Sequence, residues 1–76
     1  MNTHPRITRS PAVMGGKPCI RGMRITVGTI TGLIASGYNQ EYIIRLYPYL
    51  EAEDITAALS YATWLAESYE ADLQPA

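Results

Sequence analysis

Apolar residues in the middle of the chain recur at the spacing of an α-helix. Beyond residue 26, apolar side chains fall three or four positions apart, at Val27, Ile30, Leu33 and Ile34. This spacing places them on one face of a helix. Thr26 or Thr29 suits the N-cap of that helix, and Gly37 suits the left-handed residue that follows its last turn.

Two further helices are predicted in the second half of the chain. Asn39 is a good N-cap for a short helix that Pro48 ends, because proline disfavours helical geometry at the residue before it. A longer helix is predicted from about Ala52 to Tyr69, a segment without glycine or proline. Its apolar stripe consists of Ile55, Ala58, Leu59, Ala62, Leu65 and Tyr69.

The first 26 residues carry β patterns instead. The β-branched Ile7 and Thr8 predict a short strand over residues 6–9, which Ser10 and Pro11 end. After a break at the glycines 15 and 16, a second strand follows over residues 18–20. A turn at Gly22 lets residues 24–27 pair back. We therefore predict a mainly α fold, with a short N-terminal β-hairpin region followed by a three-helix bundle. It forms a single domain, 1–76, in which 1–26 is the β region, 27–70 the bundle and 71–76 a frayed tail.

The small size of the chain favours assembly. The sequence has 76 residues, of which 47% are hydrophobic, so it is globular but has a small core. Domains of this size usually need a disulfide, a metal or an oligomer for stability. Cys19 is the one cysteine and His4 the one histidine, which excludes an internal disulfide and a zinc site of ordinary spacing. We therefore expect a homodimer, with no metal and no cofactor.

The sequence also indicates a compartment. A lone cysteine fits a reducing environment. Residues 1–11 lack the apolar core of a secretory signal, and no stretch approaches the roughly 20 apolar residues of a membrane-spanning helix. We expect a cytoplasmic protein that does not contact a membrane.

Charge is distributed unevenly between the two halves of the chain. Residues 1–26 carry a charge of +5 and contain no acid, whereas residues 27–76 carry −6. Such asymmetry suggests two surfaces with different partners. Alternatively, the basic segment packs on or near the acidic one within the dimer.

Three segments resemble one protein family. "ITRSPAVMGGKPCIRGMRITV", "GLIASGY" and "LYPYLEAEDITAALSYA" are similar to the Domain of Unknown Function 433 family over about residues 7–65. The chain departs from the family pattern at Met23, where threonine is usual, at Thr26, where proline is frequent, and at Glu51, where threonine or serine usually caps the last helix. The resemblance implies a helix-turn-helix-like fold of three helices, frequently a dimer. It also implies an antitoxin role, paired with a nuclease-like toxin of the PIN type.

The residues do not favour catalysis. A nucleotide-binding loop needs serine or threonine after its lysine, but Pro18 follows Lys17. Cys19 has no histidine nearby in the sequence that would activate it as a nucleophile. Glu53 and Asp54 are adjacent, so they point about 100° apart on a helix and do not face each other. We expect no catalytic residue and no enzyme.

Nucleic-acid binding is one hypothesis for the basic region. In a helix-turn-helix protein the third helix would enter the major groove, but its first turn is acidic and would repel phosphates. If the protein binds DNA, the contacts are expected from the cations of the β region. These are Arg6, Arg9, Lys17, Arg21 and Arg24. The alternative is that they only keep a sheet edge soluble.

Partner binding is a second hypothesis, for the acidic and aromatic half. Tyrosine and tryptophan combine a large apolar area with a polar group, so they are frequent at interfaces. Tyr61, Trp64 and Tyr69 are the candidate partner-binding residues on the third helix. The alternative is that they complete a small core. We expect an antitoxin-like regulator that binds a PIN-type toxin and its own promoter, or else a homodimeric interaction module that binds no nucleic acid.

Overall fold

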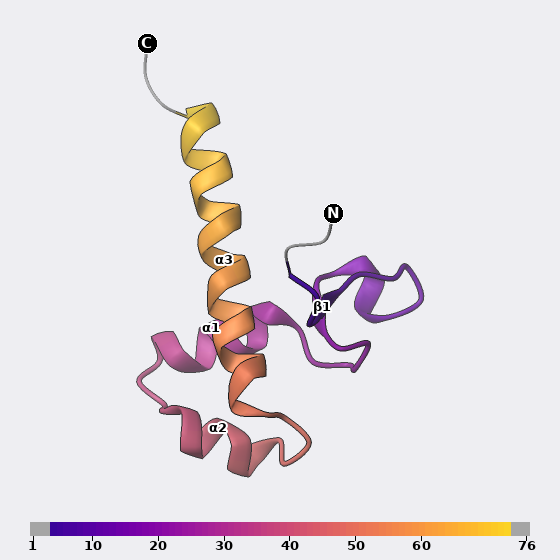
Figure 1. Cartoon of the computed structure of the whole chain (residues 1–76), viewed down its shortest axis with the longest axis vertical. Helices are drawn as coiled ribbons and strands as arrows, with labels where there is room; N and C mark the ends of the chain where they lie inside the picture. The colour runs from indigo at the N-terminus through magenta and orange to yellow at the C-terminus, as the bar shows by residue number, and fades with distance from the viewer. Residues whose placement is uncertain (1–3, 74–76) are drawn as a thin grey trace.

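The fold is mainly α-helical, with a small β-hairpin at its N-terminus, as predicted (Figure 1). A computed structural model describes the backbone of residues 4–73 and the side chains of residues 4–68. In chain order the elements are β1 (Ile7–Thr8), the 3-10 helix η1 (Met14–Gly16), β2 (Cys19–Ile20), α1 (Val27–Ala35), α2 (Gln40–Leu46) and α3 (Ala52–Leu73).

The hairpin is shorter than the sequence pattern indicated. β1 and β2 pair antiparallel, with Ile7 opposite Ile20. The segment expected to pair back contributes an isolated bridge between Cys19 and Thr26 instead of a third strand. The turn after β2 closes with a hydrogen bond from the Met23 amide to the Ile20 carbonyl at 2.8 Å.

The caps of α1 and α2 are those that the sequence predicted. The Thr26 hydroxyl accepts from the Thr29 amide, and the Asn39 side chain accepts from the Tyr42 amide. Gly37 has φ +98°, and its amide donates to Ile34 while the next amide donates to the last turn of α1. This pattern satisfies carbonyl groups that a helix end otherwise leaves unpaired.

Helix α3 is the longest element, and it organises the fold. It spans 22 residues, or about 33 Å at 1.5 Å per residue, and it extends four residues beyond the predicted end at Tyr69. In Figure 1 α1 crosses the lower part of α3, α2 lies below the lower end of α3, and the hairpin lies to the right of α3. The upper part of α3 extends beyond α1, α2 and the hairpin. Residues 74–76 of the predicted tail lie outside the described residues.

The core joins the two strands and the helices α1, α2 and α3. Ile30 and Ile43, from α1 and α2, are fully buried. The complete buried apolar cluster is Ile7, Ile20, Ile25, Val27, Ile30, Ile43, Leu50, Ile55, Ala58 and Tyr61. The predicted stripe of α3 was wrong at Leu59, which is exposed, and it omitted Tyr61, which is buried. The reason is that β1 also packs against α3, so the buried face of the helix is shifted towards the hairpin.

Candidate partner-binding surface and the basic hairpin

A buried carboxylate ties the hairpin to the first turn of α3. Asp54 is the third residue of α3 and its side chain is fully buried. Arg6 Nη1 donates to Asp54 Oδ1 at 2.8 Å, and Arg21 donates from Nε to Oδ1 at 3.0 Å and from Nη2 to Oδ2 at 2.7 Å. The two arginines approach from the end of the hairpin, where the Arg21 amide donates to the Arg6 carbonyl. We call Arg6, Arg21, Glu51 and Asp54 the arginine–aspartate cluster.

Asp54 also caps its own helix. Its Oδ2 accepts the Glu51 amide at 2.8 Å, which satisfies a backbone donor that has no partner inside the helix. Glu51 occupies the position where a serine or threonine cap was expected, and its carboxylate instead accepts from Arg6 Nη1 at 2.7 Å. The start of α3 is therefore held by arginine side chains that lie 33 to 48 positions away in sequence.

The cluster fixes the charge of Asp54. Burial by itself raises the pKa of the Asp54 carboxyl group, but hydrogen bonds from Arg21, the Glu51 amide and Arg6 outweigh it. Together they lower this pKa from 3.8 to about 2. The hydrogen bond to Glu51, followed by that to Asp54, raises the pKa of Arg6, and the hydrogen bond to Asp54 raises the pKa of Arg21. Arg6, Arg21 and Asp54 are therefore charged at neutral pH.

An unusual turn conformation delivers Arg21 to the cluster. Arg21 has φ +45° and Gly22 has φ +74°, and positive φ at both central positions is typical of a type I′ turn. The Gly22 amide donates to the Thr8 hydroxyl at 2.7 Å, and Arg21 Nη2 also donates to the Tyr49 carbonyl at 3.1 Å. The turn therefore contacts β1 and the segment before α3 at once.

The three aromatic candidates on α3 differ in their surroundings. Tyr61 is 7% exposed and belongs to the core, whereas Trp64 is 48% exposed. The Tyr69 side chain lies outside the described residues. The rings of Tyr61 and Trp64 lie 5.7 Å apart, and the His4 ring contacts both, at 5.2 and 5.6 Å. Trp64 is thus an exposed ring that other rings hold in place.

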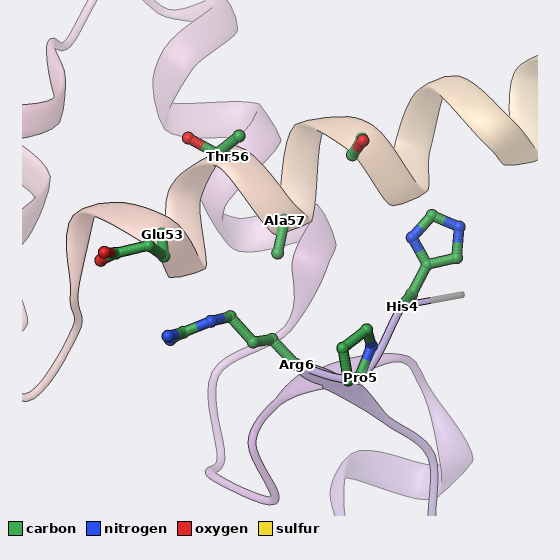
Figure 2. Close-up of a pocket in the computed structure, with 7 residues that line it drawn as sticks. His4, Pro5, Arg6, Glu53, Thr56 and Ala57 are labelled. Atoms are coloured by element: carbon green, nitrogen blue, oxygen red, sulfur yellow. The ribbon is translucent and has the colours of Figure 1, made fainter. Parts of the chain in front are cut away.

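A hollow lies on the same surface as Trp64. It has a volume of about 320 Å³ and lies between the N-terminal segment and α3 (Figure 2). Its lining residues are His4, Pro5, Arg6, Glu53, Thr56, Ala57 and Ser60. His4 both lines this hollow and contacts Trp64, so the two features form one surface. We call Trp64 and the lining of this hollow the Trp64 surface.

A second hollow lies on another side of α3. It has a volume of about 590 Å³ and lies between the start of α1 and the middle of α3. Ala62 and Leu65 of α3 form part of it and are half-buried, and Lys17 stands among its lining residues. Apolar side chains of α3 therefore remain only partly covered here.

Known proteins share the sequence pattern of the hairpin and helices. The profile of a protein family of unknown function, DUF433, matches residues 7–62. The chain belongs to the DUF433 family. It is 31% identical to a DUF433 member protein from Anabaena variabilis whose crystal structure is known, with a TM-score of 0.76 over 92% of this chain and 69% of that one.

A curated relative of this DUF433 chain is much longer. An uncharacterized protein of Sinorhizobium fredii, y4eO, is 38% identical over 56 residues, which make up 74% of this chain and 25% of that protein. Arg21 and Asp54 lie inside the region that the DUF433 profile matches, whereas His4 and Trp64 lie outside it. The Trp64 surface thus extends beyond the matched part of the family pattern.

The cations of the N-terminal β region of this chain fall into two groups. Arg6 and Arg21 are turned towards Asp54, so they are not a free basic edge. Arg9, Lys17 and Arg24 are exposed, and within the described residues none of them forms an ion pair. The packing of a basic segment on an acidic one therefore occurs within one chain. Whether the exposed cations bind nucleic acid remains a prediction.

The cluster around Asp54 was missed in the sequence, although a signal for it exists. An acidic residue three positions after a helix N-cap is the typical partner of the N-cap amide, and Asp54 stands in that position. Among residues 4–73, no three histidine, cysteine or acidic side chains gather in a way that suits a metal ion. None of the described helices is long and apolar enough to cross a membrane.

Proposed function

We propose that this DUF433 chain is a protein-interaction module of the antitoxin type, which binds a partner protein through the Trp64 surface. The observation that carries the proposal is Trp64, a large aromatic side chain that is 48% exposed on a long helix. The family resemblance suggests the partner, a nuclease-like toxin of the PIN type. In this proposal the protein acts in the cytoplasm and has no cofactor.

The geometry of the surface supports partner binding. Tryptophan is the residue type that most often contributes strongly to binding energy at protein interfaces. The contacts of Trp64 with His4 and Tyr61 reduce the freedom of its ring before binding, so less conformational entropy is lost in a complex. The adjoining hollow offers room for a side chain of the partner.

The charges of the surface favour a basic partner. Glu53 lines the hollow and Glu67 is exposed one turn beyond Trp64. Arg6 also lines the hollow, but its guanidinium group is already paired with Glu51 and Asp54. A matching partner segment therefore carries an apolar side chain for the hollow beside a lysine or arginine.

The proposal includes no catalysis. The Cys19 side chain is buried and its Sγ donates to the Lys17 carbonyl at 3.3 Å, so it is not placed to attack a substrate. Asp54 accepts four hydrogen bonds and its pKa is lowered to about 2. A general base needs a free lone pair and a pKa near the working pH, and Asp54 offers neither.

The test is Trp64→Ala in complex with the small nuclease-like protein encoded beside the native gene. We expect the variant to keep its helical circular dichroism and to lose at least about 2 kcal/mol of binding free energy, a fall of roughly thirty-fold in affinity. Isothermal titration calorimetry measures the loss. Leu46→Ala is the matched control, because Leu46 is 47% exposed but lies on α2, and it should bind normally. Equal affinity of wild type and Trp64→Ala would reject the proposal.

A homodimer is the second candidate, and the hollow beside Leu65 favours it. Ala62 and Leu65 are half-buried there, and the helix continues beyond them to Leu73. A second copy of α3 lying along this face would bury both side chains. Sedimentation equilibrium should then give a dimer for wild type and a shift to monomer for Leu65→Glu. A wild-type monomer at millimolar concentration would exclude this interface.

A further inference from the structure

The loop between β1 and β2 presents exposed cations on a fixed backbone. Arg9 and Lys17 stand at its two ends, and both are exposed. Arg9 Nε donates to the Gly16 carbonyl at 3.1 Å, so the arginine side chain closes the base of the loop. The Arg9 side chain is nevertheless exposed.

Backbone hydrogen bonds hold the rest of the loop. The Val13 amide donates to the Ser10 carbonyl at 2.9 Å, the Gly16 amide to Val13 at 3.1 Å, and the Lys17 amide to Met14 at 3.3 Å. Ser10 and Val13 also form an isolated β-bridge. A loop with so many internal bonds is preorganised, so it loses little conformational entropy on binding.

Met14 occupies a position that suits glycine better. Its φ is +51°, and Gly15 and Gly16 follow with φ +66° and +84°. A non-glycine residue in the left-handed region is strained, and such strain is found mostly at functional sites. The Met14 side chain is 39% exposed and does not belong to the core cluster. Packing in the core therefore does not explain why a large apolar side chain stands here.

We propose that this loop is a contact for double-stranded DNA, in which Arg9 and Lys17 bind backbone phosphates and the Met14 side chain enters the minor groove. Proteins that bind the minor groove frequently insert a single apolar side chain, methionine among them, between base steps. The two flanking cations suit the phosphates on either side. This inference goes beyond the proposed partner binding, because it uses a different part of the molecule.

Charge and size favour DNA over an acidic protein at this loop. A stable protein interface needs about 800 Å² on each partner, and among the described residues of the loop Met14 is the one exposed large apolar side chain. DNA contacts depend mainly on cations that neutralise phosphates. Residues 1–26 contain no acid that would oppose them.

The same structure disfavours α3 as a DNA-reading helix. Glu51, just before the helix, and Glu53, in its first turn, are exposed, while Asp54 is buried and paired with Arg6 and Arg21. The two arginines pair with Glu51 and Asp54, so little net positive charge remains at that end of the helix. The exposed cations of the loop are the better placed group for phosphates.

Fluorescence anisotropy of a labelled promoter duplex, at several salt concentrations and against a random duplex, tests the proposal. We expect salt-sensitive binding with a log–log slope of about −2 for each chain bound, since each neutralised phosphate contributes about −0.9. Lys17→Gln should make the slope shallower by about 1. Arg45→Gln, which removes an exposed cation of α2, is the matched control and should leave the slope unchanged.

Met14→Gly separates a binding role from a structural one. Glycine adopts φ +51° without strain, so the melting temperature should stay the same or rise. Affinity for the duplex should nevertheless fall about five-fold or more. The absence of duplex binding by wild type at low salt would overturn the inference, as would full affinity of Met14→Gly. Either result leaves the Trp64 surface untouched, because its test uses a protein partner and Met14→Gly should bind that partner normally.

Discussion

Asp54→Asn is expected to destabilise the fold more than any change at an exposed acid. The variant keeps the size of the side chain but places amide N–H groups against the donors of Arg6, Arg21 and the Glu51 backbone. Removing one partner of a buried ion pair typically costs about 3–5 kcal/mol. Because both guanidinium groups reach solvent in part, we expect about 2–4 kcal/mol here.

That loss is a large fraction of the total stability. A domain of this size seldom has a free energy of unfolding above about 5 kcal/mol, so Asp54→Asn should lower the melting temperature by about 10–20 °C. Urea titration followed by circular dichroism measures the change. Glu51→Gln is the control: its carboxylate pairs with the same Arg6 but is 55% exposed, and it should cost less than about 1 kcal/mol. Equal effects of the two variants would contradict the central role of Asp54.

The pH dependence of stability gives an independent check on Asp54. Its pKa is about 2 in the folded chain, against an ordinary value of 3.8. The ionised carboxyl group therefore stabilises the fold fully above pH 4, by about 2 kcal/mol. This contribution is lost as the pH falls from about 4 through 2, where the carboxyl group takes up a proton. Wild type and Asp54→Asn should thus approach each other in stability near pH 2.

Tyr61→Ala is expected to have the second large effect. Tyr61 is 7% exposed and joins α3 to the core cluster and to the His4 ring. Removing a large buried aromatic side chain typically costs about 3–5 kcal/mol, which should leave the chain largely unfolded at room temperature. Circular dichroism at 222 nm is the suitable measurement, because Trp64 lies next to the mutated residue and its fluorescence would respond locally.

Tyr61→Phe separates the ring of Tyr61 from its hydroxyl group. The substitution keeps the buried ring, which supplies the apolar area that Tyr61 contributes to the core cluster, and removes only the hydroxyl group. We therefore expect Tyr61→Phe to change the free energy of unfolding by less than about 1 kcal/mol. If Tyr61→Ala folded as well as Trp64→Ala, the assignment of Tyr61 to the core and Trp64 to the surface would be wrong.

The helices could be predicted because their signals are local. Thr26, Asn39 and Gly37 act within one turn of the helix ends that they cap. Pro48 likewise stops α2 through the geometry of its immediate neighbour. Spacing of apolar residues then gave the face of α1, on which Val27 and Ile30 are buried. Such features need only the chemistry of a few adjacent residues, so they are readable in any sequence.

The candidate sites could be predicted only in part. Trp64 was recognised as a surface candidate from its residue type and its place on α3. Tyr61 was grouped with it, but it is buried, because the hairpin covers that side of the helix. The sequence prediction treated all five cations as one basic region: Arg6, Arg9, Lys17, Arg21 and Arg24. A sequence shows the sign of each charge but not which side chains lie next to it in the folded chain.

The sequence by itself determined the mainly helical fold, the order of the elements and the caps of α1 and α2, since each depends on local geometry. Only the tertiary structure decided which charges stay at the surface. Arg21 reaches Asp54 across 33 positions, and Arg6 reaches it across 48, and no local pattern encodes such a contact. The physical reason is that burial makes an unpaired carboxylate costly, so the packing of the hairpin against α3 places two arginines on Asp54 and leaves Arg9 and Lys17 exposed.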